Sequence, residues 1–339
     1  MVVPIDPVVT EERRVTITVE APKLSVRCGY VVAHIPCPVK FKTKVCGSEK
    51  VLNIVSTTRW LILESNVPLG RINIRIINKS SFNIYVNLQY GDIPCGLGNC
   101  PRNAYAPVSP GGSVTGYVDA GDKKYISLYF TVMVEASRDI DGKSVTVGIE
   151  AWSDVFEKTT TECSTETFRF PHVGFTDLKV DSKFYEKVPG NFSVKAKLSK
   201  CPVKDLILGI KKVSGPGSVY WLKKDGKWHE VGSDYTYDVI KSGVVKPDTE
   251  GSYGGKLRFD KRGTYTLVFG VGFHDFPTSS EVYAAGIPLK GIEELMKLGL
   301  LSEPTTSEVV TKPPVMYVVK KEVEVEEEGV EIPIPKIVA

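Results

Sequence analysis

The sequence predicts an all-β protein with two β-sandwich domains, one short C-terminal amphipathic helix and an extended arm at each end. Valine, isoleucine, threonine and tyrosine are abundant among the apolar residues, and these types favour strands. Short alternating segments recur along the chain, separated by turn-forming stretches such as NKSS, SPGG and DIDG. At 339 residues and 42% hydrophobic, the chain is long enough for two domains with separate cores.

Residues 1–20 are expected to form an N-terminal arm that leads into the first strand. The arm is interrupted by Pro4 and Pro7 and carries Asp6 between them, so it lacks the basic and apolar regions of an ordinary signal peptide. We therefore expect an extended segment here and read no targeting address from it.

Residues 21–169 are expected to form the first β-sandwich. Ile72, Ile74 and Ile76 point to one side of a strand, and Phe82 and Ile84 answer them across a hairpin. This order, with its Asn-x-Ser turn and a later Pro-Gly-Gly loop, resembles the immunoglobulin-like adhesion and filament modules of prokaryotic surface proteins over residues 55–152. A jelly roll would give similar spacing. The resemblance implies a structural β-sandwich of the kind found in archaeal virions or surface filaments.

Residues 170–287 are expected to form the second β-sandwich. Its clearest part is KLRFDKRGTYTLVFGVGF, a strand, a tight turn and a second strand. Asp260, Gly263 and Tyr265 resemble the corner before a late strand of immunoglobulin-like domains, which implies that the tyrosine hydroxyl bonds to the chain just upstream. Leu267 stands where antibody domains have a cysteine, so the antibody-type disulfide is not expected.

Residues 288–302 predict an amphipathic helix that begins near Pro288 and ends near Gly299. Residues 303–339 predict an extended tail in which apolar and charged residues alternate, so that the apolar ones share one face. These apolar residues are Val323, Val325, Val330, Ile332 and Ile334. We expect the tail to add a strand to a neighbouring subunit, and 323–325 is the part best suited to this.

The seven cysteines leave three states open: a disulfide, free buried thiols or, least favoured, a zinc site. A bridge between Cys95 and Cys100 is sterically easy, because CGLGNC closes a small glycine-containing loop. Disulfides would indicate an oxidising compartment or a hyperthermophilic source.

No catalytic residue, metal ligand set or cofactor motif is expected. His274 beside Asp275 suggests a general base, but no nucleophile elbow or metal motif accompanies it, so a surface pair is the preferred interpretation. Trp221 and Trp228 flank a lysine-rich turn and are a candidate platform for a glycan or receptor, with a hairpin around half-buried tryptophans as the simpler explanation.

Two N-x-S sequons, at Asn78 and Asn191, are candidate glycosylation sites in expected turns or strand starts. The formal net charge of +3 does not point to nucleic acid. The longest apolar-rich run, from Tyr125, is about half of what a membrane-spanning helix needs. We therefore expect neither a nucleic-acid partner nor a membrane span.

The hypothesis that best fits these patterns is a non-enzymatic structural protein. It would be a virion capsid, turret or spike subunit that assembles with itself or with other structural subunits through its arms, and it would be cytoplasmic before assembly. The alternative is a carbohydrate- or receptor-binding module of a surface or filament protein. An enzyme with scattered catalytic residues is the least favoured class.

Overall fold

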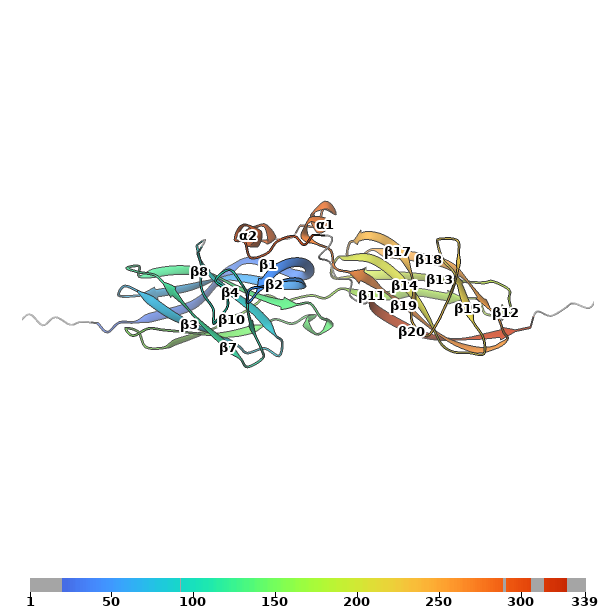
Figure 1. Ribbon diagram of the computed structural model, residues 1–339, viewed down its shortest axis with the longest axis horizontal. Helices are drawn as coiled ribbons and strands as arrows, with labels where there is room; N and C mark the ends of the chain where they lie inside the picture. Colours follow the sequence, from blue (N-terminus) through green and yellow to red (C-terminus); the bar gives the residue numbers. More distant parts are fainter. Residues whose placement is uncertain (1–19, 92, 289–290, 306–313, 328–339) are drawn as a thin grey trace, which may run out of the picture.

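The computed structural model describes residues 20–91, 93–288, 291–305 and 314–327 (Figure 1). Within these residues the chain forms four β-sheets and two short α-helices, which confirms the all-β prediction. Sheets A and B form the first half of the molecule, and sheets C and D form the second half. The two halves lie end to end along the long axis, with the helices beside their junction.

The first half contains strands β1 to β10, and the 3₁₀ turn η1 (Arg138–Ile140) lies between β8 and β9. Sheet A has the order β1 (Leu24–Val45), β2 (Ser48–Ser65), β8 (Tyr125–Glu135), β4 (Ile84–Tyr90) and β5 (Ile93–Pro94), with β6 (Ala106–Val108) also beside β4. Sheet B has the order β10 (Thr159–Ser164), β9 (Thr146–Trp152), β3 (Arg71–Asn78) and β7 (Ser113–Asp119).

The second half contains strands β11 to β20. Sheet C has the order β11 (His172–Val180), β13 (Gly190–Ser199), β18 (Glu250–Phe259), β15 (Val219–Leu222) and β16 (Trp228–Glu230). Sheet D has the order β12 (Phe184–Tyr185), β20 (Val315–Glu326), β19 (Gly263–Asp275), β14 (Val203–Ser214) and β17 (Thr236–Val245). The helices α1 (Ser279–Ala284) and α2 (Ile292–Lys297) lie between β19 and β20 in the chain.

Each half is held together by a core to which both of its sheets contribute. In the first half, Leu61 of sheet A and Ile74 of sheet B belong to the same buried cluster. In the second half, Val194 of sheet C and Phe269 of sheet D do the same. Alternation along each strand supplies these residues, because every second side chain points inward.

The tyrosine corner expected in the second half is confirmed. The Tyr265 hydroxyl donates a hydrogen bond to the carbonyl of Lys261 at 2.8 Å, and the ring is fully buried. The bond fixes the turn that leads into β19, the central strand of sheet D.

The expected hairpin between residues 72 and 84 is wrong. β3 pairs with β7 and β9 in sheet B, whereas β4 pairs with β5, β6 and β8 in sheet A, so the chain crosses from one sheet to the other. The buried Asn78 side chain holds this crossing: its amide donates to the carbonyls of Phe82 and Val108, and its oxygen accepts from the Ser80 amide. Alternation predicts the same inward-facing residues for a hairpin and for a crossing between two sheets, so it cannot distinguish the two connections.

The helix expected over 288–302 is shorter in the structure, and another short helix, α1, precedes this range. α2 covers six residues, and positive φ angles of 89° at Gly291 and 69° at Gly299 bound it. α1 falls inside the range assigned to the second sandwich, where Thr278 and Glu281 form a capping box. This T-x-x-E pattern is a helix-start signal visible in the sequence.

The tail does not extend as a separate arm from residue 303. Residues 315–326 form β20, which pairs along its length with β19 of the same chain, so Val323 and Val325 lie in the core of the second half. This corrects the expectation that 323–325 would insert into a neighbour, because β19 offers a free edge within the chain. Val330, Ile332 and Ile334, like the arm 1–19, lie outside the described residues.

We predict that Gly272→Ala disrupts the β19–β20 pairing. A Cβ at Gly272 would lie 1.9 Å from the Val315 carbonyl oxygen, so the free energy of unfolding should fall by about 2 kcal/mol or more. Gly254→Ala is the matched control, since a Cβ there meets nothing within 4 Å. Urea denaturation of both variants checks this, and equal stability of the two would contradict the assigned pairing.

Candidate functional site at the junction of the two halves

A segment from the end of the second half lies across the first half and ties the two together. We call residues 276–303 the strap. After β19 it lies along β1, where the Lys40 amide donates to the Pro277 carbonyl at 2.9 Å. Farther along, Lys42 and Ser302 exchange two backbone hydrogen bonds of 2.9 and 3.0 Å. The next described strand, β20, belongs to sheet D, so the strap lies on the first half between two strands of the second half.

The strap packs through an apolar face. Figure 1 shows α2 over β1 and β2 of the first half, with α1 nearer the second half. A Cβ on Gly291 would lie 2.4 Å from the Ala33 Cβ, so only glycine allows this approach of α2 to β1. The buried strap residues of this third cluster are Val282, Ile292, Leu295, Leu300 and Leu301, and their partners in the first half include Ile35, Phe41, Ile54, Tyr105 and Met133.

A disulfide also crosses the junction. Cys37 of β1 is bonded to Cys201, which lies in the turn between β13 and β14, with a Cα–Cα distance of 5.5 Å. Next to it the Arg169 amide donates to the carbonyl of Pro36 at 2.8 Å. Since the bond joins residues 164 positions apart, it restricts the unfolded chain strongly.

A buried ion pair lies beside the strap. Lys40 contacts Asp275 at the end of β19, and their side chains are only 5% and 12% exposed. The second carboxylate oxygen of Asp275 accepts the Phe276 amide at 2.8 Å. The pair joins the first strand of one half to the central strand of the other.

Arg138 reaches from the first half to β20 in the second. Its guanidinium lies 4.4 Å from the ring centre of Tyr317 and donates to the Met316 carbonyl at 2.7 Å. The Tyr317 hydroxyl in turn donates to the carbonyl of Pro171, in the link between the halves, at 2.8 Å. These contacts anchor β20 near its first residues.

Two carboxylates at the junction are kept ionised by their partners. Burial acts to raise the pKa of Asp141, but hydrogen bonds from Lys200 and from the Phe170 amide outweigh it and leave the pKa below its ordinary value. Glu281 follows the same pattern, because the hydrogen bond from Lys204 outweighs the effect of burial on its pKa. At neutral pH both carboxylates are therefore ionised and form ion pairs with their lysines.

The expected bridge between Cys95 and Cys100 is wrong. Cys100 is bonded to Cys46 instead, and Cys95 is a free, buried thiol whose pKa burial raises to about 11. The Cys95 side chain is oriented into the core of the first half, whereas Cys100 at the edge of the same core is bonded to Cys46. Loop size alone cannot reveal this orientation.

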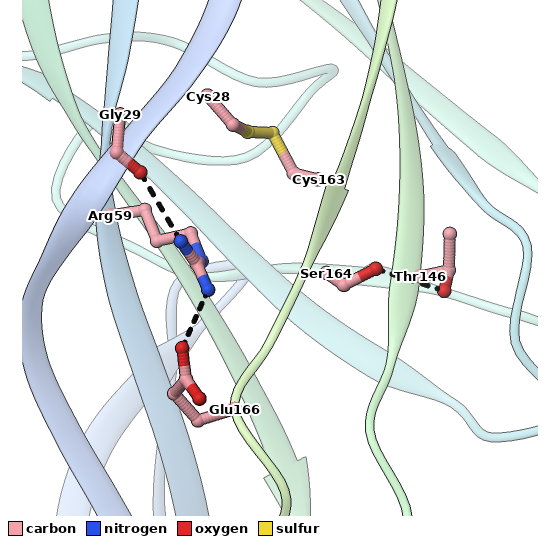
Figure 2. Close-up of a disulfide and its surroundings, with 7 residues drawn as sticks. All are labelled: Cys28, Gly29, Arg59, Thr146, Cys163, Ser164 and Glu166. Carbon is pink, nitrogen blue, oxygen red and sulfur yellow. Dashed lines mark hydrogen bonds and ion pairs between the residues drawn. A yellow bond between two sulfur atoms is a disulfide. The ribbon is translucent and has the colours of Figure 1, made fainter.

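The third disulfide joins the two sheets of the first half (Figure 2). Cys28 of β1 is bonded to Cys163 of β10, with a Cα–Cα distance of 5.7 Å. Beside it the Arg59 guanidinium donates to the Gly29 carbonyl at 3.2 Å and to the Glu166 carboxylate at 2.7 Å. β1 is therefore bonded covalently to sheet B at one point and to the second half at another.

The tryptophan pair does not form a platform. Trp221 is fully buried in the core of the second half, because it points inward from β15. Trp228 lies half-buried on β16, opposite Leu222, and the Arg258 guanidinium is 4.8 Å from its ring centre. A shallow hollow of about 390 Å³ lies on the same sheet, and its lining includes Leu222 and Lys256.

The two sequons differ in accessibility. Asn78 is fully buried and its side-chain amide nitrogen already donates two hydrogen bonds, which rules out display of a glycan at this residue. Asn191 is exposed at the start of β13, and its glycosylation stays a prediction.

The described residues contain no group of three or more His, Cys, Asp or Glu side chains that could hold a metal ion. No helix among them has the length and apolar character needed to cross a membrane. His274 lies 3.9 Å from Asp205 rather than pairing with Asp275, which is directed at Lys40. The junction pair Lys40–Asp275 was missed because no sequence signal links residues 235 positions apart.

No family model matches the chain, and no curated protein matches it. Three solved structures show a likeness. A red sea bream transglutaminase is 9% identical with a TM-score of 0.26 and covers 92% of this chain, which spans about a third (32%) of that protein. The C-terminal domain of the Streptococcus pyogenes antigen I/II-family protein AspA is 10% identical, with a TM-score of 0.31, covering 72% of this chain and 97% of that one. The D00-D0 domain of intimin is 13% identical, with a TM-score of 0.21, covering 73% and 91%. At these TM-scores the likenesses carry no functional argument.

We predict that Cys37→Ser combined with Cys201→Ser lowers the free energy of unfolding by about 2–5 kcal/mol, since a long loop is released. Chemical denaturation under non-reducing conditions measures the change, and Cys95→Ala is the control that leaves all three bridges intact. A non-reducing peptide map without a bridge between Cys37 and Cys201, or a double variant as stable as the wild type, would contradict the prediction.

We predict that Asp141→Asn destabilises the protein at neutral pH and that this effect fades on acidification. A carboxyl whose folded pKa is lowered contributes stability above its unfolded pKa, near about 4, and loses it as the pH falls through the folded pKa. The melting temperatures of variant and wild type should therefore converge below about pH 4. The exposed neighbour substitution Asp139→Asn is the control, and a constant difference across pH would contradict the assignment.

Proposed function

We propose that the chain is a non-enzymatic structural protein of a virion or cell surface, in which two β-sandwich halves act as one rigid unit. The observation that carries this proposal is the junction. A strap, a disulfide and a buried ion pair all cross it, whereas domains in one chain usually move relative to each other.

The junction suits a load-bearing or spacing role better than catalysis. Enzymes that use two domains commonly place the site between them and open and close it. Here the strap contacts and the Cys37–Cys201 bond cross the junction and oppose such opening. A fixed end-to-end arrangement supports a subunit that holds a constant length and orientation.

The cysteines support a location outside the reducing cytosol. Six of the seven are bonded in three disulfides, and such bonds persist in oxidising surroundings such as cell surfaces and virions. A hyperthermophilic source would also permit them. Assembly with like or unlike subunits belongs to this proposal, without the exchange of residues 323–325 that the sequence first indicated.

The carbohydrate-binding alternative has less support. It rested on two tryptophans, and Trp221 is buried, while the half-buried Trp228 stacks with Arg258. The shallow hollow on sheet C is lined mostly by lysine and glycine residues, and Phe192 is the one aromatic residue in this lining.

We expect an antibody raised against the folded protein to label the exterior of intact source particles or cells in immunogold electron microscopy. A cytosolic marker should stay unlabelled until the sample is permeabilised. Thiol alkylation of the same intact material should modify none of the six bonded cysteines. Labelling that requires permeabilisation, together with alkylation of those cysteines, would overturn the proposal.

A further inference from the structure

The contact between Lys40 and Asp275 differs from the other charged contacts at the junction in its burial. The side chains are 5% and 12% exposed. By comparison, Lys200 is 45% exposed in its contact with Asp141. Water therefore reaches the Lys200–Asp141 contact, whereas it is nearly excluded from Lys40 and Asp275.

Both members of the buried pair are held in place by the backbone around them. The Lys40 amide donates to the Pro277 carbonyl at 2.9 Å, which sets β1 beside the residues that follow Asp275. The Phe276 amide donates to one oxygen of the Asp275 carboxylate, so the other oxygen is directed at the Lys40 amine. Folding thus brings an amine and a carboxyl group together in one defined orientation.

The residue that follows Asp275 in the chain lies among buried aromatic rings. Phe276 packs against Phe170 and Phe273, with ring centroids 5.7 and 5.2 Å away, and all three rings are at most 6% exposed. An ammonium and a carboxylate in such a place lose much of their hydration, and a buried ion pair recovers that loss only in part. A neutral product would be favoured here more than in water.

We propose that Lys40 and Asp275 condense to an intramolecular isopeptide bond. The ammonium passes one proton to the carboxylate, which gives a neutral amine and a carboxylic acid. The Lys40 Nζ then attacks the Asp275 carboxyl carbon, a C–N bond forms, the C–OH bond breaks, and a second proton from Nζ leaves with the hydroxyl as water. The step changes no oxidation state and requires no co-reactant.

The proximity of the Lys40 amine to the Asp275 carboxyl group favours a condensation that is unfavourable between separate molecules in dilute solution. Well-oriented intramolecular reactions reach effective concentrations of about 10⁵–10⁸ M, because folding has already removed the freedom of the two groups. The exclusion of water also removes the reagent that would hydrolyse the product. The exposed Lys200–Asp141 and Lys204–Glu281 contacts lack this protection and should stay ionic.

The bond would join β1 to the end of β19, independently of the Cys37–Cys201 disulfide, so a reducing agent would not separate the halves. This chemistry depends on the Lys40–Asp275 pair alone and is independent of whether the protein belongs to a virion or a cell surface.

Mass spectrometry of the full-length folded protein tests the proposal. After reduction and alkylation, the wild type should weigh one water molecule less than its sequence requires. A proteolytic digest should contain a branched peptide joining the segments of Lys40 and Asp275. Lys40→Arg keeps a cation against Asp275 but lacks the attacking amine, so it should show the full mass and two linear peptides.

If only part of the wild type is cross-linked, incubation of the folded protein should increase the lighter species, whereas incubation in urea should not. The result does not require any variant to fold, because the wild-type mass is decisive. A wild type of full mass that yields only linear peptides, or a cross-link found at Lys200–Asp141 or Lys204–Glu281 instead, would overturn the proposal.

Discussion

The placement of β1 is the constraint on which the rest of the structure depends. This 22-residue strand pairs with β2 in sheet A, is bonded through Cys28 to sheet B and is bonded through Cys37 to the second half. Its central part is covered by the strap, and Lys40 reaches the end of β19. A strand that contacts so many elements fixes the orientation of both halves, because moving it would break covalent and apolar contacts together.

The strap and the Cys37–Cys201 disulfide restrain different motions of the two halves, so together they restrict the orientation of the halves more than either does alone. The disulfide limits the separation of the halves near Cys37. The strap resists bending, since its apolar residues would be exposed to water if the halves tilted apart. The charged contacts of Arg138 and Lys200 lie on further parts of the junction and oppose rotation. Several weak restraints spread over a surface hold orientation better than one strong bond.

Much of the local structure could be predicted from the sequence, because it depends on neighbours in the chain. Alternation identifies the strands, and the D-x-x-G-x-Y arrangement predicts the Tyr265 hydrogen bond. The partners could not be predicted. Cys100 is bonded to Cys46 and not to Cys95, and β20 pairs with β19 of the same chain and not with a neighbouring subunit. Both outcomes depend on which elements meet in space. The candidate site was missed for the same reason, since it is made entirely of contacts distant in sequence.

The order of elements along the chain has a consequence for synthesis. β20 completes sheet D, yet in the chain it follows the strap, which packs on the other half. During translation the first half has all of its own strands by residue 164. In the second half β19 has only β14 beside it until residue 326 has emerged. Both β12 and one edge of β19 therefore wait for β20, so sheet D keeps an open edge until the last of its strands has been made.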